Sequence, residues 1–161
     1  MLRSRMDREK LRLDAFLPYR LSFTSNLVSD SIAATYEALF GINIPEWRVI
    51  AWVAEAGSIT QQDICDRSRM DKTSVSRAAV ALTHRGILER RTNTDDRRSR
   101  FLALTPAGEE LYRAIAPKAL ELERAIFSHF APEELDAFKS MLLRIDRLTL
   151  DAMEAQRTRG R

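Results

Sequence analysis

Five arginines gather in one short stretch of the sequence, where side chains of this type can bind an anion. They are Arg90, Arg91, Arg97, Arg98 and Arg100. Two short apolar runs flank the polar, turn-forming residues Thr92 to Ser99, a pattern that predicts a β-hairpin. Guanidinium groups bind phosphates and carboxylates through paired, charge-assisted hydrogen bonds. The sequence therefore predicts a cationic hairpin with an anionic partner.

The positive charge of the chain is concentrated around this hairpin. Residues 67–101 hold 10 Lys or Arg and 4 Asp or Glu, a local charge of +6, whereas the whole chain of 161 residues carries +3. A solvated charged surface is the alternative interpretation. Clustering of positive charge on one motif nevertheless favours contact with phosphates.

A helix predicted over residues 71–85 ends at Gly86, directly before the hairpin. Its apolar face carries Val75, Ala78, Ala79 and Leu82. The polar side chains on and beside the opposite face are Thr73, Ser74, Ser76, Arg77 and His84. Small hydroxyls and one arginine suit a helix in a DNA major groove, because they allow close approach and hydrogen-bond phosphates and base edges. A solvated face is the alternative, but a helix followed by a basic hairpin favours the DNA-reading half of a winged helix.

A second short helix is expected just before this one. Thr60 and Asp63 have the spacing of a capping box, and Asp71 is suited to cap the helix that follows. Two short helices separated by residues 68–70 predict a helix-turn-helix. Gln61, at the start of the first of these helices, is a further expected DNA contact.

Long amphipathic helices are expected on both sides of this central unit. Apolar residues recur at spacings of 4 and 7 over residues 17–39, Thr105-Pro106 begins a helix after the hairpin, and Pro132 begins the last helix. The heptad seam of the last helix is Leu135, Phe138, Leu142 and Ile145. These faces predict packing against a second chain, and an intramolecular bundle that covers the winged helix is the alternative. A two-fold dimer places two reading helices about one DNA turn apart, so a pseudo-palindromic site is expected.

Together these patterns predict a mainly α fold, a winged helix-turn-helix with a two-stranded wing and long N- and C-terminal helices that form a dimerisation domain. The expected boundaries are an N-terminal dimerisation helix over residues 1–44, a DNA-binding lobe over 45–104 and C-terminal dimerisation helices over 105–155. Residues 156–161 contain no apolar side chain and are expected to form a disordered tail.

Several other classes of protein find little support in the sequence. A single cysteine excludes an internal disulfide framework, and Cys65 is interpreted as a packing residue. No apolar run reaches the roughly 18 residues of a membrane span, and the charged N-terminus lacks a signal-peptide core, so a cytoplasmic location is expected. The five glycines form no phosphate loop, and His84 and His129 lie far apart without a metal-ligand cluster. We therefore expect no enzyme activity, no metal and no cofactor.

Two segments resemble the MarR (multiple antibiotic resistance regulator) family of bacterial transcription factors. Residues 96–108 read Asp-Arg-Arg-Ser-Arg-Phe-Leu-Ala-Leu-Thr-Pro-Ala-Gly, which is similar to the wing signature of that family, and residues 71–77 are similar to the start of its recognition helix. The resemblance extends from about Leu17 to Met153. It implies a triangular helical homodimer with winged-helix lobes, which binds double-stranded DNA and commonly acts as a repressor.

The resemblance also implies roles for individual residues. Those expected to face the major groove are Thr73, Ser74, Ser76 and Arg77. Arg97 or Arg98 is expected to enter the flanking minor groove, where negative potential is concentrated at A·T-rich sequence. Asp96 is expected to pair with an arginine and fix the shape of the wing.

Members of the family are commonly released from DNA by small aromatic or lipophilic ligands. The candidate ligand residues here are Tyr19, Arg20, Asn26, Trp47 and Arg48. Rings for stacking and guanidinium groups for a carboxylate suit an aromatic acid or an aromatic acyl-CoA thioester. Core packing is the alternative role for Trp47, and surface ion pairing is the alternative for Arg20 and Arg48. A non-specific architectural DNA binder and a winged-helix module for protein partners stay open as alternative functions.

Overall fold

The computed structural model describes residues 11–93 and 99–159. The chain divides into two compact units, residues 1–117 and residues 118–161. This boundary lies at Pro117, inside a long helix, and does not coincide with any of the expected domain boundaries. The expected division into dimerisation and DNA-binding parts concerns function and stays a prediction.

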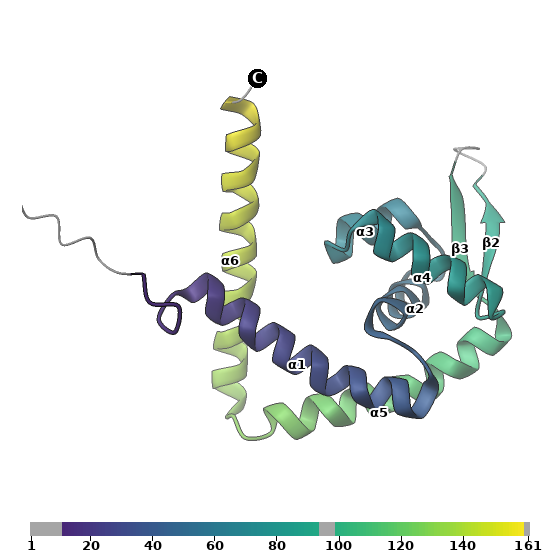
Figure 1. Cartoon of the computed structure of the whole chain (residues 1–161), viewed down its shortest axis with the longest axis horizontal. Coiled ribbons are helices and arrows are strands. Elements are labelled where there is room, and N and C mark those ends of the chain that lie inside the picture. The colour runs from purple at the N-terminus through teal and green to yellow at the C-terminus, as the bar shows by residue number, and fades with distance from the viewer. Residues whose placement is uncertain (1–10, 94–98, 160–161) are drawn as a thin grey trace, which may run out of the picture. The chain divides into compact units, whose positions relative to one another are not determined.

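The first unit contains four complete helices and three strands among its described residues (Figure 1). The helices are α1 (Leu17–Phe40), α2 (Ile44–Ala56), α3 (Gln61–Ser68) and α4 (Lys72–His84). The strands are β1 (Ile59–Thr60), β2 (Leu88–Thr92) and β3 (Arg100–Leu104). Gly41 ends α1 in the left-handed conformation with φ 60°, which glycine adopts without steric cost.

The strands form one antiparallel sheet in the order β1-β3-β2. The pairing of β2 with β3 runs from Leu88 opposite Leu104 to Thr92 opposite Arg100, which confirms the predicted hairpin. Strand β1 adds a third strand to the expected two-stranded wing by placing Ile59 opposite Leu102. Two residues are too few to show the alternation by which a strand is recognised in sequence.

The core of the first unit lies between the sheet and the helices. Among its fully or almost fully buried members are Val49, Ile50, Val53, Ile59, Ile64, Val75, Ala78, Ala79, Leu82, Leu88 and Leu102. All four residues expected on the apolar face of α4 are buried, because a 3.6-residue period places them on one side of the helix. Packing of this face fixes α4 in the unit and leaves its other face in solvent.

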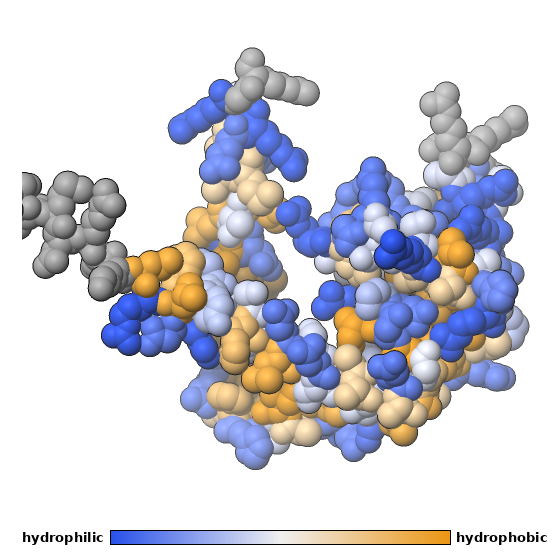
Figure 2. All heavy atoms as spheres, in the orientation of Figure 1, coloured by the Kyte–Doolittle hydropathy of each residue, from blue (hydrophilic) through white to orange (hydrophobic). Residues whose placement is uncertain are grey.

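Two long helices make up the end of the chain, α5 (Pro106–Phe127) and α6 (Pro132–Arg159). None of the described residues of α6 is buried, and Phe138 and Ile145 of the predicted seam are 41% and 42% exposed. Apolar residues are visible on α6 and on the first turns of α1 (Figure 2). No helix in the described part of the chain has the length and apolar character needed to cross a membrane.

The expectation of a disordered tail from Gln156 is wrong for residues 156–159, because α6 continues to Arg159. Thr158 Oγ1 donates a hydrogen bond of 2.7 Å to the carbonyl oxygen of Glu154. Arg157 and Arg159 place positive charge at the helix C-terminus, where it interacts favourably with the helix dipole. Hydrogen bonding and favourable charge within the last turns therefore extend α6 to Arg159, although these residues have no apolar side chain to pack.

Candidate nucleic-acid interface

The N-terminus of α4 is fixed by Asp71, as the sequence predicts. The Asp71 carboxylate accepts hydrogen bonds from the backbone N–H and the side-chain hydroxyl of Ser74, at 2.9 and 2.7 Å. These bonds favour the charged form and lower the pKa of Asp71 below its usual value. The hydroxyl of Ser74 therefore donates its hydrogen to Asp71, and its oxygen can only accept a hydrogen bond from another partner.

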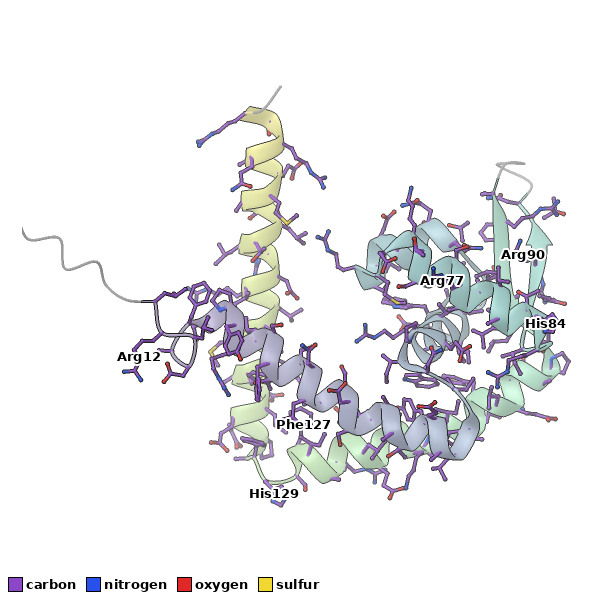
Figure 3. All side chains as sticks on the ribbon, in the orientation of Figure 1. Arg12, Arg77, His84, Arg90, Phe127 and His129 are labelled. Carbon is purple, nitrogen blue, oxygen red and sulfur yellow. The ribbon has the colours of Figure 1, made fainter. Side chains whose placement is uncertain are left out.

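A continuous stripe of exposed side chains runs along the outer face of α4. Its members are Thr73, Ser76, Arg77, Val80 and His84. They recur at intervals of three and four residues, so they lie on one helix face. Arg77 and His84 are labelled on this helix in Figure 3. Sequence reasoning found four of the five and missed Val80, which is 53% exposed although it is aliphatic.

Helix α3 lies against α4 and completes the helix-turn-helix. Thr60 caps it by accepting a hydrogen bond of 3.1 Å from the backbone N–H of Asp63, as the capping-box spacing predicts. Gln61 is the first residue of α3 and is half-buried. The Arg67 guanidinium of α3 lies over the ring of Trp52 of α2, 5.8 Å from the ring centroid, and forms a cation–π contact between the two helices.

The hairpin presents its described arginines in different ways. Arg91 pairs with Glu89 at 2.7 Å, and Arg100 donates a hydrogen bond of 3.2 Å to the hydroxyl of Thr92. Arg90 is exposed on β2, the strand that lies beside α4 (Figure 3). Arg97 and Arg98, the predicted minor-groove residues, lie outside the described residues, as does Asp96. Their roles stay predictions.

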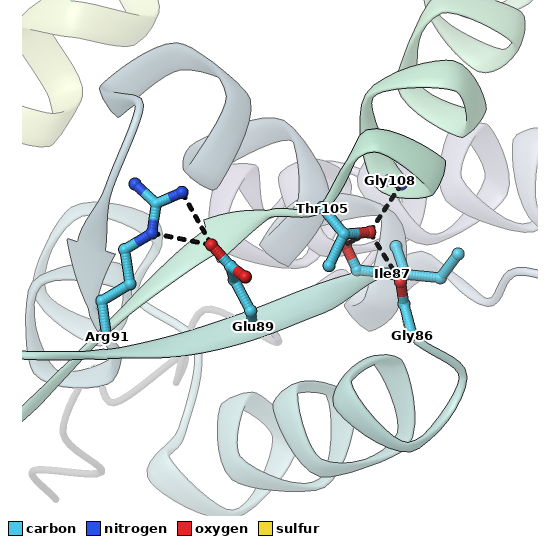
Figure 4. A network of polar contacts seen from close by, with 6 residues as sticks. All are labelled: Gly86, Ile87, Glu89, Arg91, Thr105 and Gly108. Carbon is cyan, nitrogen blue, oxygen red and sulfur yellow. Dashed lines mark hydrogen bonds and ion pairs between the residues drawn. The ribbon is translucent and has the colours of Figure 1, made fainter.

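A group of hydrogen bonds fixes the base of the hairpin to the start of α5 (Figure 4). Thr105 Oγ1 donates to the carbonyl oxygen of Gly86 at 2.6 Å and accepts from the backbone N–H of Gly108 at 3.1 Å. The backbone N–H of Thr105 donates to the carbonyl oxygen of Ile87 at 3.1 Å. A Cβ atom at position 108 would collide with that same carbonyl oxygen. This geometry gives a physical reason for threonine at position 105 and glycine at position 108.

The C-terminal end of α4 is fixed by a pair that sequence reasoning missed. Arg85 Nη1 donates to the carbonyl oxygen of Gly41 at 3.0 Å and lies 3.6 Å from Glu46 Oε2. Glu46 is almost completely buried and also accepts a hydrogen bond from the backbone N–H of Asn43, which closes the capping box of α2. The contact connects α4 to the corner between α1 and α2.

Trp47 lies at the centre of an aromatic cluster. Its ring stacks on Tyr112 with centroids 5.9 Å apart and meets the edge of Tyr36 at 5.5 Å. Burial raises the pKa of Tyr36, because the charged phenolate is disfavoured away from water. Sequence reasoning missed Tyr36 and Tyr112 as neighbours of Trp47, since they lie on other helices, α1 and α5, and no spacing rule within one helix connects them.

The other expected ligand residues lie elsewhere on the helices. Tyr19, Arg20 and Asn26 are exposed on the first half of α1, where the Arg20 guanidinium lies 5.2 Å from the ring of Phe23. Arg48 is exposed on α2. Within the part of the chain that the structure describes, no ring contact joins Tyr19 to Trp47, and neither Arg20 nor Arg48 forms an ion pair.

Metal chemistry has no visible basis in the described residues, where no group of three or more His, Cys, Asp or Glu side chains is placed to hold a metal ion. Cys65 is a half-buried free thiol on α3. The geometry instead combines an exposed helix face, a helix-turn-helix and a cationic hairpin. These features define a winged helix-turn-helix protein of the DNA-binding class.

Comparison with known proteins shows similarity to one family of regulators. Residues 40–99 match the model of the MarR family. The HTH-type transcriptional regulator YwoH of Bacillus subtilis is 28% identical over 102 residues, which cover 63% of this chain and 74% of YwoH. FarR of Neisseria gonorrhoeae is 27% identical over 103 residues, 64% of this chain and 70% of FarR. Over residues 40–99 the chain therefore matches the MarR family, and its curated relatives are HTH-type transcriptional regulators.

Solved structures show the same fold over most of the chain. A MarR/EmrR family regulator from Acinetobacter sp. ADP1 has a TM-score of 0.79 and 28% identity, with 88% of this chain and 99% of that chain covered. Sco3205 from Streptomyces coelicolor, solved in complex with DNA, has a TM-score of 0.76 and 19% identity, covering 88% and 91%. CouR from Rhodococcus jostii RHA1, solved with p-coumaroyl-CoA bound, has a TM-score of 0.74 and 18% identity, covering 84% and 96%.

Proposed function

We propose that this protein is a sequence-specific repressor that binds a pseudo-palindromic operator as a homodimer. The observation that carries the proposal is the exposed stripe of α4 beside the cationic hairpin. Small polar groups and Arg77 on that stripe suit the base edges of a major groove. A purely architectural DNA binder needs only backbone contacts, so it has no use for such a face.

Dimerisation is supported by apolar side chains that the single chain leaves in water. Leu17 and Leu27 on α1 are 73% and 60% exposed, and Leu143 and Leu148 on α6 are 67% and 61% exposed. Contiguous exposed apolar surface commonly marks a protein interface. In a two-fold dimer these helices would pack against the same helices of a second copy and set the spacing of two reading helices.

The hairpin tip is proposed to contact the minor groove through Arg97 or Arg98. We expect Arg98→Ala to weaken binding to the matched site by about 1–3 kcal/mol and to reduce its salt dependence. Arg113→Ala is the matched control, because Arg113 already pairs with Glu109 at 2.7 Å on α5. Unchanged affinity of a folded Arg98→Ala dimer would refute this role for Arg98 and leave Arg97 as the candidate.

The effector is proposed to be an aromatic acid or an aromatic acyl-CoA thioester. The aromatic cluster around Trp47 and the fold shared with CouR support this class of ligand. Tyr19 and Tyr36 are 17 residues apart on α1, about 25 Å at the helical rise, so one aromatic acid does not span both within a chain. The proposed site therefore takes Tyr19, Arg20 and Asn26 from one chain and Trp47 and Arg48 from another, or holds an extended thioester.

Calorimetry tests the ligand class directly. Benzoate, p-coumarate and p-coumaroyl-CoA are titrated into the purified protein and into the variants Trp47→Ala and Arg20→Ala. We expect saturable binding of at least one compound, weakened in both variants, and release of bound DNA by the same compound. Absence of binding for all three would remove the support for an aromatic effector.

Selection of fragmented genomic DNA by the purified protein at physiological salt tests the function itself. We expect enrichment of a short inverted repeat and repression of a promoter that contains it in a transcription assay. Binding without sequence preference and with steep salt dependence would favour an architectural role. Absence of DNA binding by the folded protein would favour a module for acidic protein partners.

A further inference from the structure

Val80 is an aliphatic residue on the exposed face of α4, where the stability of the helix does not require an apolar side chain. It is 53% exposed, whereas Val75 and Leu82 of the same helix are completely buried. A β-branched residue at an exposed helix position is slightly less favourable than alanine, because its side chain loses rotamer freedom. Neither core packing nor helix propensity accounts for valine at this position.

The neighbours of Val80 form a polar and cationic rim around it. Ser76 and Arg77 precede it by four and three residues, and His84 follows by four, so all lie on the same helix face. A shallow hollow in the surface is lined by Ser76, Arg77, Val80, Ala81, His84 and Arg85. An apolar floor therefore lies at the centre of the stripe through which α4 faces solvent.

The occupant of this hollow must combine an apolar group with surrounding acceptors and negative charge. Within a DNA major groove, the thymine C5-methyl is the apolar group, and it distinguishes thymine from cytosine and from uracil. Nearby guanine and adenine N7 atoms and phosphates supply the acceptors that Arg77 and Ser76 can bind.

We propose that Val80 contacts a thymine methyl group in each half-site and is a specificity-determining residue of this protein. The proposal rests on the proposed function, since it requires α4 to enter the major groove of a preferred sequence. Val80 supplies the apolar contact, and Arg77 and Ser76 supply hydrogen bonds beside it. The preference for thymine at this position comes from burial of one methyl group.

The test uses the duplex that the full-length wild-type protein selects from a random library. Each symmetric pair of thymines is replaced in turn by deoxyuridine, which removes only the methyl groups. We expect one pair at which wild-type affinity falls about fourfold per half-site, equivalent to about 0.8 kcal/mol for one buried methyl. The Val80→Ala protein should bind the thymine duplex more weakly and show no difference between thymine and deoxyuridine at that pair.

Ser76→Ala is the matched control on the same helix face, one turn before Val80. It should retain the discrimination between thymine and deoxyuridine even if its affinity falls. Thermal unfolding checks that Val80→Ala is folded, which its exposure favours. If the protein selects no sequence, the proposed function fails together with this proposal. If a sequence is selected but no thymine is sensitive, or Val80→Ala keeps the sensitivity, only the role of Val80 is refuted.

Discussion

Asp71 fixes the start of helix α4 through its carboxylate. Its hydrogen bonds from Ser74 hold its pKa below the usual value, so its charged form contributes stability at neutral pH. A group with a lowered folded-state pKa contributes fully above its unfolded pKa of about 3.9 and loses that contribution as the pH falls through its folded-state pKa. Asparagine caps a helix about as well and does not titrate.

The expected result is therefore a pH-dependent difference between the wild type and Asp71→Asn. The free energy of unfolding of the wild type, relative to Asp71→Asn, should decrease as the pH is lowered from about 5 to about 2. Urea unfolding at a series of pH values measures it, and the other carboxylates cancel because both proteins contain them. A difference that does not vary with pH would show that Asp71 gains nothing from ionisation.

Gly108 and Gly86 are glycines for different physical reasons. At Gly108 a side chain would collide with the backbone of Ile87, whereas at Gly86 there is open space but φ is 70°. We expect Gly108→Ala to destabilise the protein by about 1–3 kcal/mol through overpacking, and Gly86→Ala by about 1 kcal/mol through backbone strain. Urea unfolding measures both, with the exposed substitution Ala107→Ser as control. Equal stability of Gly108→Ala and the wild type would contradict the close approach at the base of the hairpin.

At the scale of the element, α4 is fixed at both ends by different chemistry. Asp71 caps its start, and Arg85 attaches its end to Gly41 and Glu46. Glu46→Ala leaves the N–H of Asn43 without its acceptor and Arg85 without its carboxylate, so it should destabilise the protein by about 1–2 kcal/mol. Glu46→Gln keeps an acceptor and should cost less, because a partly exposed ion pair contributes about 0–1 kcal/mol.

Urea unfolding of these variants, with Glu55→Ala on the exposed face of α2 as control, measures the contribution of Glu46. DNA affinity provides a second measurement, since a loosened α4 should bind its site more weakly in Glu46→Ala than in Glu46→Gln. Equal effects of the two substitutions on stability would show that the charge of Glu46, and not its hydrogen bond to Asn43, is what matters.

Local chemistry determined which elements could be predicted from the sequence. The buried face of α4 follows from its helical period, and the caps at Thr60 and Asp71 follow from short-range spacing. The hairpin follows from turn residues between apolar runs. The contact of Arg85 with Glu46 joins residues 39 positions apart, and no spacing rule reports such a pair. Val80 was missed because sequence patterns assign aliphatic residues to the core, and its exposure is known only from the packed helix.

At the scale of the molecule, the single chain has two kinds of helix surface. The core of the first unit is nearly free of solvent, whereas α6 has no buried residue among those described. Aliphatic and aromatic side chains left in water favour association, at roughly 25 cal/mol for each Å² that becomes buried. The expected dimerisation helices therefore have a physical reason to bind a second copy, and operator binding should depend on that association.

Substitution of the α6 seam tests this dependence. We expect the double variant Phe138→Asp, Ile145→Asp to be mainly monomeric, because a charge in an apolar interface is strongly unfavourable without a partner. Ser140→Asp adds charge to the opposite face of α6 and should remain dimeric. Sedimentation equilibrium measures the association, and affinity for an inverted repeat against a single half-site measures its consequence. The seam variant should lose the preference for the inverted repeat, and a monomer that keeps this preference would separate operator recognition from dimerisation.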